Sequence, residues 1–180
     1  MTELSAAQAQ ASDSQPIEIR QLVYTDLPQV IAIERRVFPT PWSLAMFVLE
    51  LSKQSGICLA AMSGQRLVGY LICSRYDTVW HVMNVAVDLD RQRMGLASAL
   101  LADLYARVGD EDARFTLEVR RSNRIAIHLY EREGFRAAGI RRRYYQDNGE
   151  DALVMWRTPA TLTRDPGSDP LRDVPNPGPA

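Results

Sequence analysis

A join between a strand and a helix near the middle of the chain constrains the fold more than any other feature. Residues 78–87 form a strand-like run, and residues 96–108, LASALLADLYARV, are apolar on the 3.6-residue period of a helix. Asp90–Gly95 links the two and ends in a glycine at the start of the helix. Such a helix has to bury its apolar stripe, so we expect it to pack on the sheet to which the strand belongs.

The remaining segments continue this alternation of strands and helices. Thr25 or Asp26 caps the first helix, which tolerates Pro28 in its first turn, and Ser43 is the candidate N-cap of the second. Strands are expected at 17–22, 56–62, 66–76, 113–119 and 135–140, a helix at 123–133, and a hairpin arm at 144–156 that turns near Asp147–Gly149. The order predicts one α/β (α+β) domain at 16–158, with a mixed sheet of about seven strands flanked by about four helices.

The composition of the 180 residues supports one globular domain with two tails. The tails, 1–15 and the Pro-rich 159–180, cannot bury enough apolar surface to fold and are expected to be disordered. A net charge of -1 gives no general attraction to nucleic acid or to an anionic membrane. Cys58 and Cys73 lack the spacing of a metal site and fit buried thiols, and the N-terminus lacks a secretion signal, so we expect a cytoplasmic protein.

The glycine at the start of the helix suits a phosphate group. The first N–H groups of a helix have no intrahelical partners, and a side chain at Gly95 would keep a diphosphate away from them. Arg91 and Arg93 add positive charge, and Ala97 is small enough to allow close approach. The loop by itself is equally compatible with an ordinary capped helix. ATP and NAD are poor candidates, because the chain has neither G-x-x-x-x-G-K-[ST] nor a G-x-G-x-x-G that opens a first strand-helix unit.

A motif downstream of this join is specific to one family. The run TLEVRRSNRIAIHLYEREGF at 116–135, with IRRRYY at 140–145 and GEDA at 149–152, resembles the GCN5-related N-acetyltransferase (GNAT) superfamily. The likeness is strongest to its RimI-type branch and covers about residues 17–157. It implies a mixed sheet splayed between strands 4 and 5, with acetyl-CoA as co-substrate in the gap. It also implies that the acceptor is a protein N-terminus, the N-terminal alanine of a small-subunit ribosomal protein.

The resemblance assigns roles to individual positions. It implies that the pantetheine arm pairs with the strand edge at Val85, Ala86 and Val87. It implies a pyrophosphate loop that consists of Arg93, Met94, Gly95, Leu96, Ala97 and Ser98. It also implies that the side chain of Asn123 contacts the cofactor. Phe38 and Pro39 are similar to one wall of the family's peptide site, and Tyr144 and Tyr145 to the other.

Acetyl transfer from a thioester to an amine needs a base for the ammonium group, a donor for the oxyanion and an acid for the departing thiolate. The resemblance assigns Glu118 as the base, acting directly or through a water molecule, and Tyr130 as the acid. A backbone N–H of the Val85–Val87 strand is the natural oxyanion donor. His128 has no partner triad and neither have the cysteines, so we expect direct transfer without an acyl-enzyme intermediate.

Other interpretations stay open at this point. Glu118 could be an ordinary solvated carboxylate, and Tyr130 and Phe38 could belong to the core. Arg141–Arg143 fits a solvated edge better than a nucleic-acid site. The substrate could be a small amine, such as a polyamine or an antibiotic, or the chain could be a non-catalytic acyl-CoA-binding module. The aromatic walls favour a peptide, and the presence of both Glu118 and Tyr130 favours an enzyme.

Overall fold

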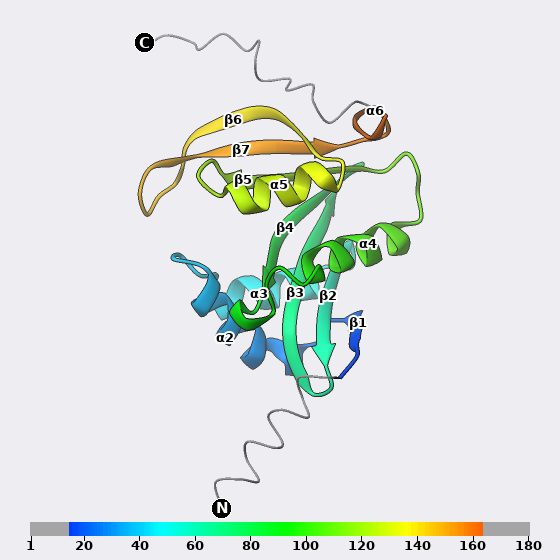
Figure 1. The fold of residues 1–180 in the computed structure, drawn as a ribbon, viewed down its shortest axis with the longest axis vertical. Coiled ribbons are helices and arrows are strands. Elements are labelled where there is room, and N and C mark those ends of the chain that lie inside the picture. Colours follow the sequence, from blue (N-terminus) through cyan, green and yellow to red (C-terminus); the bar gives the residue numbers. More distant parts are fainter. Residues whose placement is uncertain (1–14, 164–180) are drawn as a thin grey trace, which may run out of the picture. The chain divides into compact units, whose positions relative to one another are not determined.

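The structure, a computed structural model, describes residues 15–163, so the predictions for residues 1–14 and 164–180 lie outside the described part of the chain. The elements shown in Figure 1 are, in order, β1 (Ile17–Gln21), η1 (Tyr24–Asp26), α2 (Leu27–Val37), α3 (Leu44–Ser52), β2 (Gly56–Ser63), β3 (Arg66–Tyr76), β4 (Val79–Val87), η2 (Leu89–Arg91), α4 (Leu96–Val108), β5 (Arg114–Arg120), α5 (Arg124–Arg132), β6 (Arg136–Tyr145), β7 (Glu150–Arg157) and α6 (Pro159–Leu162).

The strands form one mixed sheet of seven strands in the order β1-β2-β3-β4-β5-β7-β6. The pairs β1–β2, β2–β3, β5–β7 and β6–β7 are antiparallel. β4 and β5 are parallel, and their pairing joins Val79–His81 to Arg114–Thr116. The predicted mixed α/β sheet of about seven strands is therefore confirmed. No helix between residues 15 and 163 combines the length and the apolar character that crossing a bilayer requires.

The chain divides into two compact units, and each is described here by itself. Within the described residues, the first unit contains 15–75 and 82–109, and the second contains 76–81 and 110–163. The first three residues of β4 thus belong to the second unit, and the rest of that strand belongs to the first.

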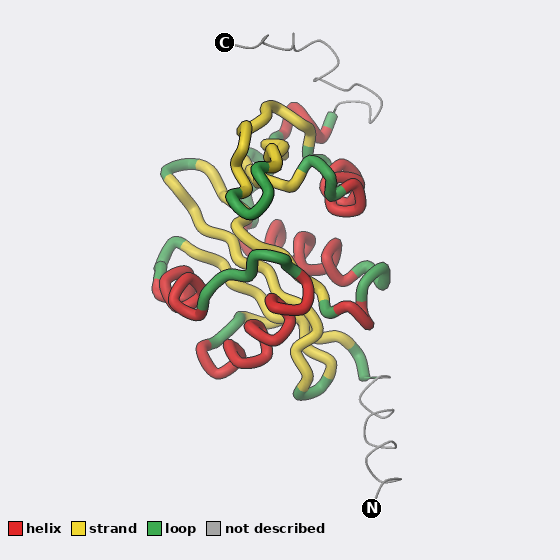
Figure 2. The backbone as a smooth tube through the Cα atoms, turned by 90° about the vertical axis from the view of Figure 1, so that its left-hand side faces the viewer, coloured by secondary structure: helices red, strands yellow, loops and turns green. Residues whose placement is uncertain are grey.

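Helices cover both faces of the strands in the first unit (Figure 2). Tyr70 on β3 is buried against Phe47 of α3, with ring centroids 5.6 Å apart, and its hydroxyl donates to Glu34 of α2. The preceding residue, Gly69, faces the other way, since an added Cβ there would lie 3.6 Å from Cδ1 of Leu100 on α4. Because consecutive residues of a strand face opposite sides, α2 and α3 pack on one face and α4 on the other.

The second unit contains the helix α5 and the strands β5, β6 and β7. Ile127 and Tyr130 are the residues that α5 buries, and Tyr130 packs edge-on against Phe135 with ring centroids 5.7 Å apart. Phe135 itself is fully buried at the turn into β6. The helix predicted at 123–133 is thus present as Arg124–Arg132, and aromatic packing anchors it.

Several local predictions are confirmed. Asp26 stands at the N-cap position of α2, although its carboxylate accepts the N–H of Val23 rather than one of the first helical turn, and Pro28 lies in that turn. Ser43 is the N-cap of α3, where its hydroxyl oxygen accepts a backbone N–H of the first turn. Cys58 and Cys73 are free and buried, and burial, together with the nearby Glu50 carboxylate, raises the pKa of Cys58 to about 11. Both thiols are therefore protonated at neutral pH.

The strand predicted to end at Ile140 is longer. β6 continues to Tyr145, and its register against β7 is irregular between Arg141 and Tyr145, where Arg143 has a positive φ of 51°. Much of this strand is exposed, because it lies at the edge of the sheet. Its polar residues therefore do not alternate with apolar ones, and the two-residue period that marks a half-buried strand is missing.

The predicted disorder of 159–180 is wrong for its first residues. Pro159–Leu162 forms the short helix α6, which brings the α-helices in the described range to five rather than about four. Thr158 caps α6, and its hydroxyl accepts the N–H of Thr161 while the Thr161 hydroxyl accepts the N–H of Thr158. Leu162 occupies the space beside Gly134, where an added Cβ would lie 2.5 Å from its Cδ2. Capping and one apolar contact thus order a segment whose composition indicates none.

A buried carboxylate connects the elements of the first unit. Glu34 on α2 is 1% exposed. Its Oε1 accepts the N–H of Trp42 at 2.7 Å, and its Oε2 accepts the hydroxyl of Tyr70 on β3 and the Nδ2 group of Asn84 on β4, the latter at 3.2 Å. One side chain therefore links α2, two strands and the loop that leads to α3.

Replacement of Glu34 tests this network. In Glu34→Gln an amide N–H₂ faces buried donors, so we expect the free energy of unfolding to fall by about 3 kcal/mol. The exposed Glu111→Gln should change it by less than about 0.5 kcal/mol. Urea unfolding curves with a constant slope would measure both. Equal midpoints for the two variants would contradict the structural role of Glu34.

Candidate active site

Two residues just before α4 have a left-handed backbone. Gly95 is the N-cap of α4 with φ of 81°, and Arg93 is also left-handed with φ of 65°. A Cβ added at Gly95 would meet no atom of the described residues within 4 Å. The glycine is thus needed for its conformation, and it leaves open space before the free N–H groups of the first helical turn.

The hydroxyl of Ser98 is a second feature of this turn. Its Oγ is buried and has no hydrogen-bond partner among residues 15–163. Buried polar atoms in folded proteins nearly always have a partner, so this hydroxyl is suited to a bound group. Leu96 is buried under the turn and Ala97 is half-buried, whereas Met94 is 62% exposed. These four predicted positions therefore differ, because Leu96 anchors the helix while Met94, Ala97 and Ser98 are suited to contact a ligand.

The predicted pantetheine edge lies just before this turn on β4. Ala86 and Val87 are buried and Val85 is half-buried. The carbonyl of Val87 accepts Nε2 of Gln92 at 3.1 Å, which ties the loop back to the strand that precedes it. The strand edge and the turn are therefore held as one piece within the first unit.

The two residues of the predicted first peptide wall follow α2. Phe38 is half-buried and packs on the core cluster of the first unit, which agrees with the core interpretation of this residue. Its N–H bonds to the carbonyl of Glu34 at 3.0 Å and ends the helix. Pro39 is exposed. Only Pro39 and the exposed part of Phe38 are thus open to a substrate.

Glu118 lies in a cluster of charged side chains in the second unit. Its Oε2 is 2.5 Å from Nε2 of His81 on β4, and its Oε1 is 3.1 Å from the guanidinium of Arg141 on β6. The Glu118 side chain is only 7% exposed, whereas that of His81 is 23% exposed. Each oxygen of the carboxylate therefore has a charged or polar partner. The alternative interpretation of Glu118 as an ordinary solvated carboxylate does not agree with this burial.

The partners of Glu118 determine its ionisation. Burial by itself would raise the pKa of this carboxyl, but the hydrogen bond from His81 and the charges of His81 and Arg141 outweigh burial and lower the pKa below its ordinary value of 4.5. Glu118 is therefore ionised at neutral pH. The stability that its pairing contributes is present above the ordinary pKa and is lost as the pH falls through the lowered one.

Tyr130 has the opposite ionisation. It is 9% exposed on α5, and burial, with a smaller contribution from Tyr145, raises its pKa to about 12. Burial also raises the pKa of Tyr145 to about 12, and Glu118 contributes to that shift although the guanidinium of Arg120, 3.9 Å from the Tyr145 ring centre, opposes it. Both phenols are therefore protonated at neutral pH, and Tyr145 lies close enough to Tyr130 and to Glu118 for an electrostatic interaction with each.

The other predicted residues of the second unit have local structural roles. Asn123 is the N-cap of α5, where its Oδ1 accepts the N–H of Ala126 at 3.1 Å. Tyr144 is 43% exposed and meets the Tyr145 ring edge-on, with centroids 5.2 Å apart. The two tyrosines thus form an aromatic pair at the edge strand, with one ring accessible.

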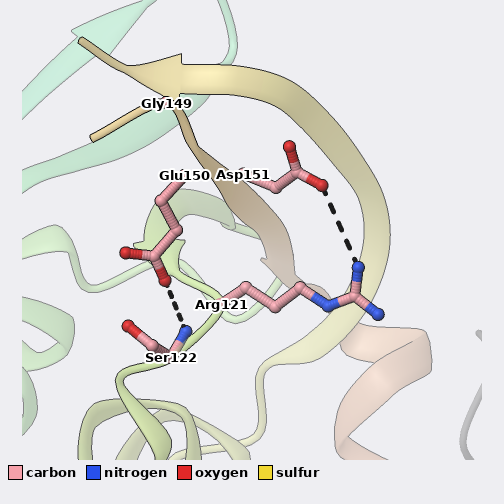
Figure 3. A pocket seen from close by; sticks show the side chains of 5 residues that line it. All are labelled: Arg121, Ser122, Gly149, Glu150 and Asp151. Carbon is pink, nitrogen blue, oxygen red and sulfur yellow. Dashed lines mark hydrogen bonds and ion pairs between the residues drawn. The ribbon is translucent and has the colours of Figure 1, made fainter. Parts of the chain in front are cut away.

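A surface pocket lies at the junction of β5 and α5 in the same unit. Figure 3 shows its lining residues Arg121, Ser122, Gly149, Glu150 and Asp151. Glu150 accepts the N–H of Ser122 at 2.7 Å, and the guanidinium of Arg121 lies 3.9 Å from Asp151. These polar groups pair with one another, and none of the predicted site residues lines the pocket.

His81 and Arg141 were not predicted as site residues. His81 is an isolated histidine in a strand, and its approach to Glu118 depends on the register of β4 against β5. Arg141 was interpreted as part of a solvated edge, and its side chain is indeed 55% exposed while its tip pairs with Glu118. Only the pairing of strands distant in sequence reveals either contact.

Known proteins show the same sequence pattern and fold. The Acetyltransferase (GNAT) family profile matches residues 27–135. The chain is 35% identical over 154 residues to the N-alpha-acetyltransferase RimI of Mycobacterium tuberculosis. This alignment covers 81% of this chain and 95% of that protein. It is 38% identical over 140 residues to the ribosomal protein bS18-alanine N-acetyltransferase of Escherichia coli, covering 76% and 94%.

A solved structure agrees with these relatives. The crystal structure of the ribosomal-protein-S18-alanine N-acetyltransferase from Escherichia coli matches with a TM-score of 0.73 at 36% identity, covering 79% of this chain and 94% of that chain. The family profile spans more than half of the sequence, and the relatives cover most of it. The chain therefore belongs to the GNAT family of acetyltransferases and is an N-acetyltransferase.

Proposed function

We propose that this enzyme transfers the acetyl group of acetyl-CoA to the N-terminal α-amine of a protein, and that the substrate is a small-subunit ribosomal protein that begins with alanine. The observation that carries the proposal is the presence, in the second unit, of an ionised carboxylate at Glu118 and a protonated phenol at Tyr130. These are the two protonation states that the transfer needs. The names of the relatives from Mycobacterium tuberculosis and Escherichia coli support an N-terminal amine, and alanine, as the acceptor.

The first unit fits acetyl-CoA, which supplies the thioester. We assign its diphosphate to the turn at Arg93–Ser98, where the left-handed residues, the open space at Gly95 and the hydroxyl of Ser98 are suited to an anion. We assign the pantetheine arm to the backbone of Val85–Val87, in the manner of an added strand. Asn123 uses its Oδ1 for capping, so its Nδ2 group is the atom proposed to contact the cofactor.

The acceptor peptide is assigned to the aromatic residues of the two predicted walls. The accessible ring of Tyr144 and the exposed Pro39 can contact its side chains. The Tyr145 hydroxyl, protonated at neutral pH, can donate a hydrogen bond to a peptide carbonyl. The aromatic character of these walls favours a peptide over a polyamine.

The chemistry follows from the ionisation of each group. An α-amino group has an ordinary pKa near 8, so much of it is already neutral at neutral pH, and removal of the remaining proton falls to Glu118 and the groups bonded to it. The neutral amine attacks the thioester carbon, and a backbone N–H of Val85–Val87 stabilises the oxyanion. Tyr130 gives its proton to the departing sulfur and regains one from the nitrogen that has formed the amide.

Mass spectrometry of the products tests the substrate class. Peptides of one sequence that differ only in the first residue would be incubated with the enzyme and acetyl-CoA, together with a polyamine. We expect acetylation at the α-amine, fastest for the peptide that begins with alanine. Products on lysine side chains or on the polyamine would contradict the proposal, and cofactor binding without any product would indicate a non-catalytic module.

Gly95→Ala tests the phosphate turn. The new Cβ would enter the space assigned to the diphosphate and would strain a left-handed residue by about 1 kcal/mol. We expect acetyl-CoA affinity, measured by calorimetry, to fall by at least about tenfold. Gly109→Ala is a matched control at the other end of α4, because Gly109 has φ of 60° and an added Cβ would meet only a carbonyl at 3.7 Å. Equal affinities for the two variants would place the diphosphate elsewhere.

Tyr130→Phe tests the acid. The ring and its packing on Phe135 remain, but the proton donor is lost, so we expect kcat to fall by about 10²-fold with acetyl-CoA affinity unchanged. Tyr24→Phe removes a phenol that is 53% exposed in the first unit and should leave both quantities unchanged. An unchanged kcat in Tyr130→Phe would remove this residue as the acid.

A further inference from the structure

The assignment of Glu118 as the base does not explain why an imidazole, that of His81, contacts this carboxylate. His81 is paired with Thr116 in the parallel ladder, and Glu118 lies two residues further on β5, on the same face. This places Nε2 of His81 2.5 Å from Oε2 of Glu118. A separation this short between a nitrogen and a carboxylate oxygen requires a proton between them.

That proton determines the tautomer of the imidazole. An ionised carboxylate only accepts hydrogen bonds, so the ring nitrogen that faces it has to carry hydrogen. Nε2 of His81 is therefore the protonated nitrogen, and Nδ1 holds the free electron pair. The basic atom of this pair is thus on the imidazole, at the side turned away from Glu118.

Glu118 itself is a weak base in this setting. Each of its oxygens already has a partner, His81 on one and Arg141 on the other, and the pKa of the carboxyl lies below 4.5. The ammonium group of a peptide has a pKa near 8, more than about three units higher, whereas imidazoles as a class titrate near 6.5. Proton transfer to an imidazole is therefore much less unfavourable than transfer to this carboxylate.

We propose that His81 receives and holds the proton taken from the substrate amine, while Glu118 keeps its negative charge, fixes the ring and stabilises the imidazolium. This role rests on the proposed function, because it concerns the same acetyl transfer. It is the division of work between an imidazole and a buried carboxylate that serves nucleophile activation in other enzymes. Here the activated group is the amine of the substrate.

The protons balance over the cycle. The ammonium loses one proton to Nδ1 of His81, which becomes imidazolium, and no other bond changes in that step. After attack, the nitrogen loses its second proton as the amide forms and the C–S bond breaks. That proton replaces the one that Tyr130 has given to the thiolate, so the products are the amide and the thiol. The imidazolium then releases the first proton to solvent, which the 23% exposure of His81 permits.

The neighbours of the pair are charged or aromatic. Arg141 on β6 pairs with Oε1 of Glu118, and the ring of Tyr76 at the end of β3 meets the imidazole edge-on with centroids 6.3 Å apart. Tyr145 on β6 is affected electrostatically by Glu118. Glu118 is the one carboxylate that contacts His81 among the described residues, so it is the group that stabilises the imidazolium.

The pH dependence of kcat distinguishes His81 from Glu118 as the group that holds the proton. His81→Gln keeps a donor for Glu118 but cannot titrate, so we expect kcat to fall by about 10²-fold and the decrease at acid pH to disappear. Glu118→Gln should keep that decrease and shift it to lower pH, because the imidazolium loses its counter-charge. His128→Gln is the matched control, since His128 is the other of the two histidines in the chain and its side chain is 82% exposed. Its profile should match that of the unmodified enzyme.

Two results would overturn the role of His81. One is an acid decrease that persists in His81→Gln and vanishes in Glu118→Gln. The other is a ring ¹⁵N NMR titration of the unmodified enzyme that shows Nδ1 protonated and Nε2 titrating, a measurement that needs no variant to fold and uses His128→Gln only for assignment. If the unmodified enzyme acetylates no peptide, the proposed function fails. Active enzyme with either of the two results above rejects His81 alone.

Discussion

The first unit depends on one carboxylate that is removed from water. Glu34 accepts hydrogen bonds from the Trp42 backbone, from Tyr70 and from Asn84, so that α2, β3, β4 and the α2–α3 loop converge on a single side chain. A polar group buried in this way is strongly unfavourable unless it is hydrogen-bonded, and the donors around Glu34 provide those bonds. The loop that carries Phe38 and Pro39 is therefore held at both ends, by the C-terminus of α2 and by the Trp42 contact.

Much of the fold could be predicted because its elements are periodic and clearly terminated. The helix at Leu96–Val108 shows its 3.6-residue period and has glycines at both ends, and Ser43 marks the start of α3. β6 and α6 could not be predicted in the same way. The outer half of β6 is exposed and irregular, so no alternation marks it, and α6 depends on a cap and on the contact of Leu162 beside Gly134, which is distant in sequence.

The candidate site likewise contains residues that the local sequence predicts and residues that only the pairing of distant strands reveals. The turn at Gly95 was predictable as a glycine at the point where a strand-loop segment becomes an amphipathic helix, whereas its left-handed backbone is known only from the structure. Residues of the motif around Glu118 and Tyr130 could be recognised by resemblance, and their cofactor and substrate roles stay predictions. The environment of Glu118 could not be deduced, since its partners come from β4 and β6 and depend on strand register. For the same reason the sequence did not indicate His81.

Glu34 and Glu118 show how the partners of a carboxylate decide what it can do. Both are largely buried, but Glu34 is surrounded by a backbone amide, a phenol and a side-chain amide, none of which accepts a proton at neutral pH. Its contacts therefore suit a structural role. Glu118 instead contacts an imidazole and a guanidinium, and the imidazole has a second nitrogen that does not face the carboxylate. A carboxylate that is too weak a base to hold a proton can still promote its transfer when it faces such a ring, because its fixed charge stabilises the protonated partner. The low pKa of Glu118 thus suits it to the role of a permanent counter-charge better than to that of the base itself.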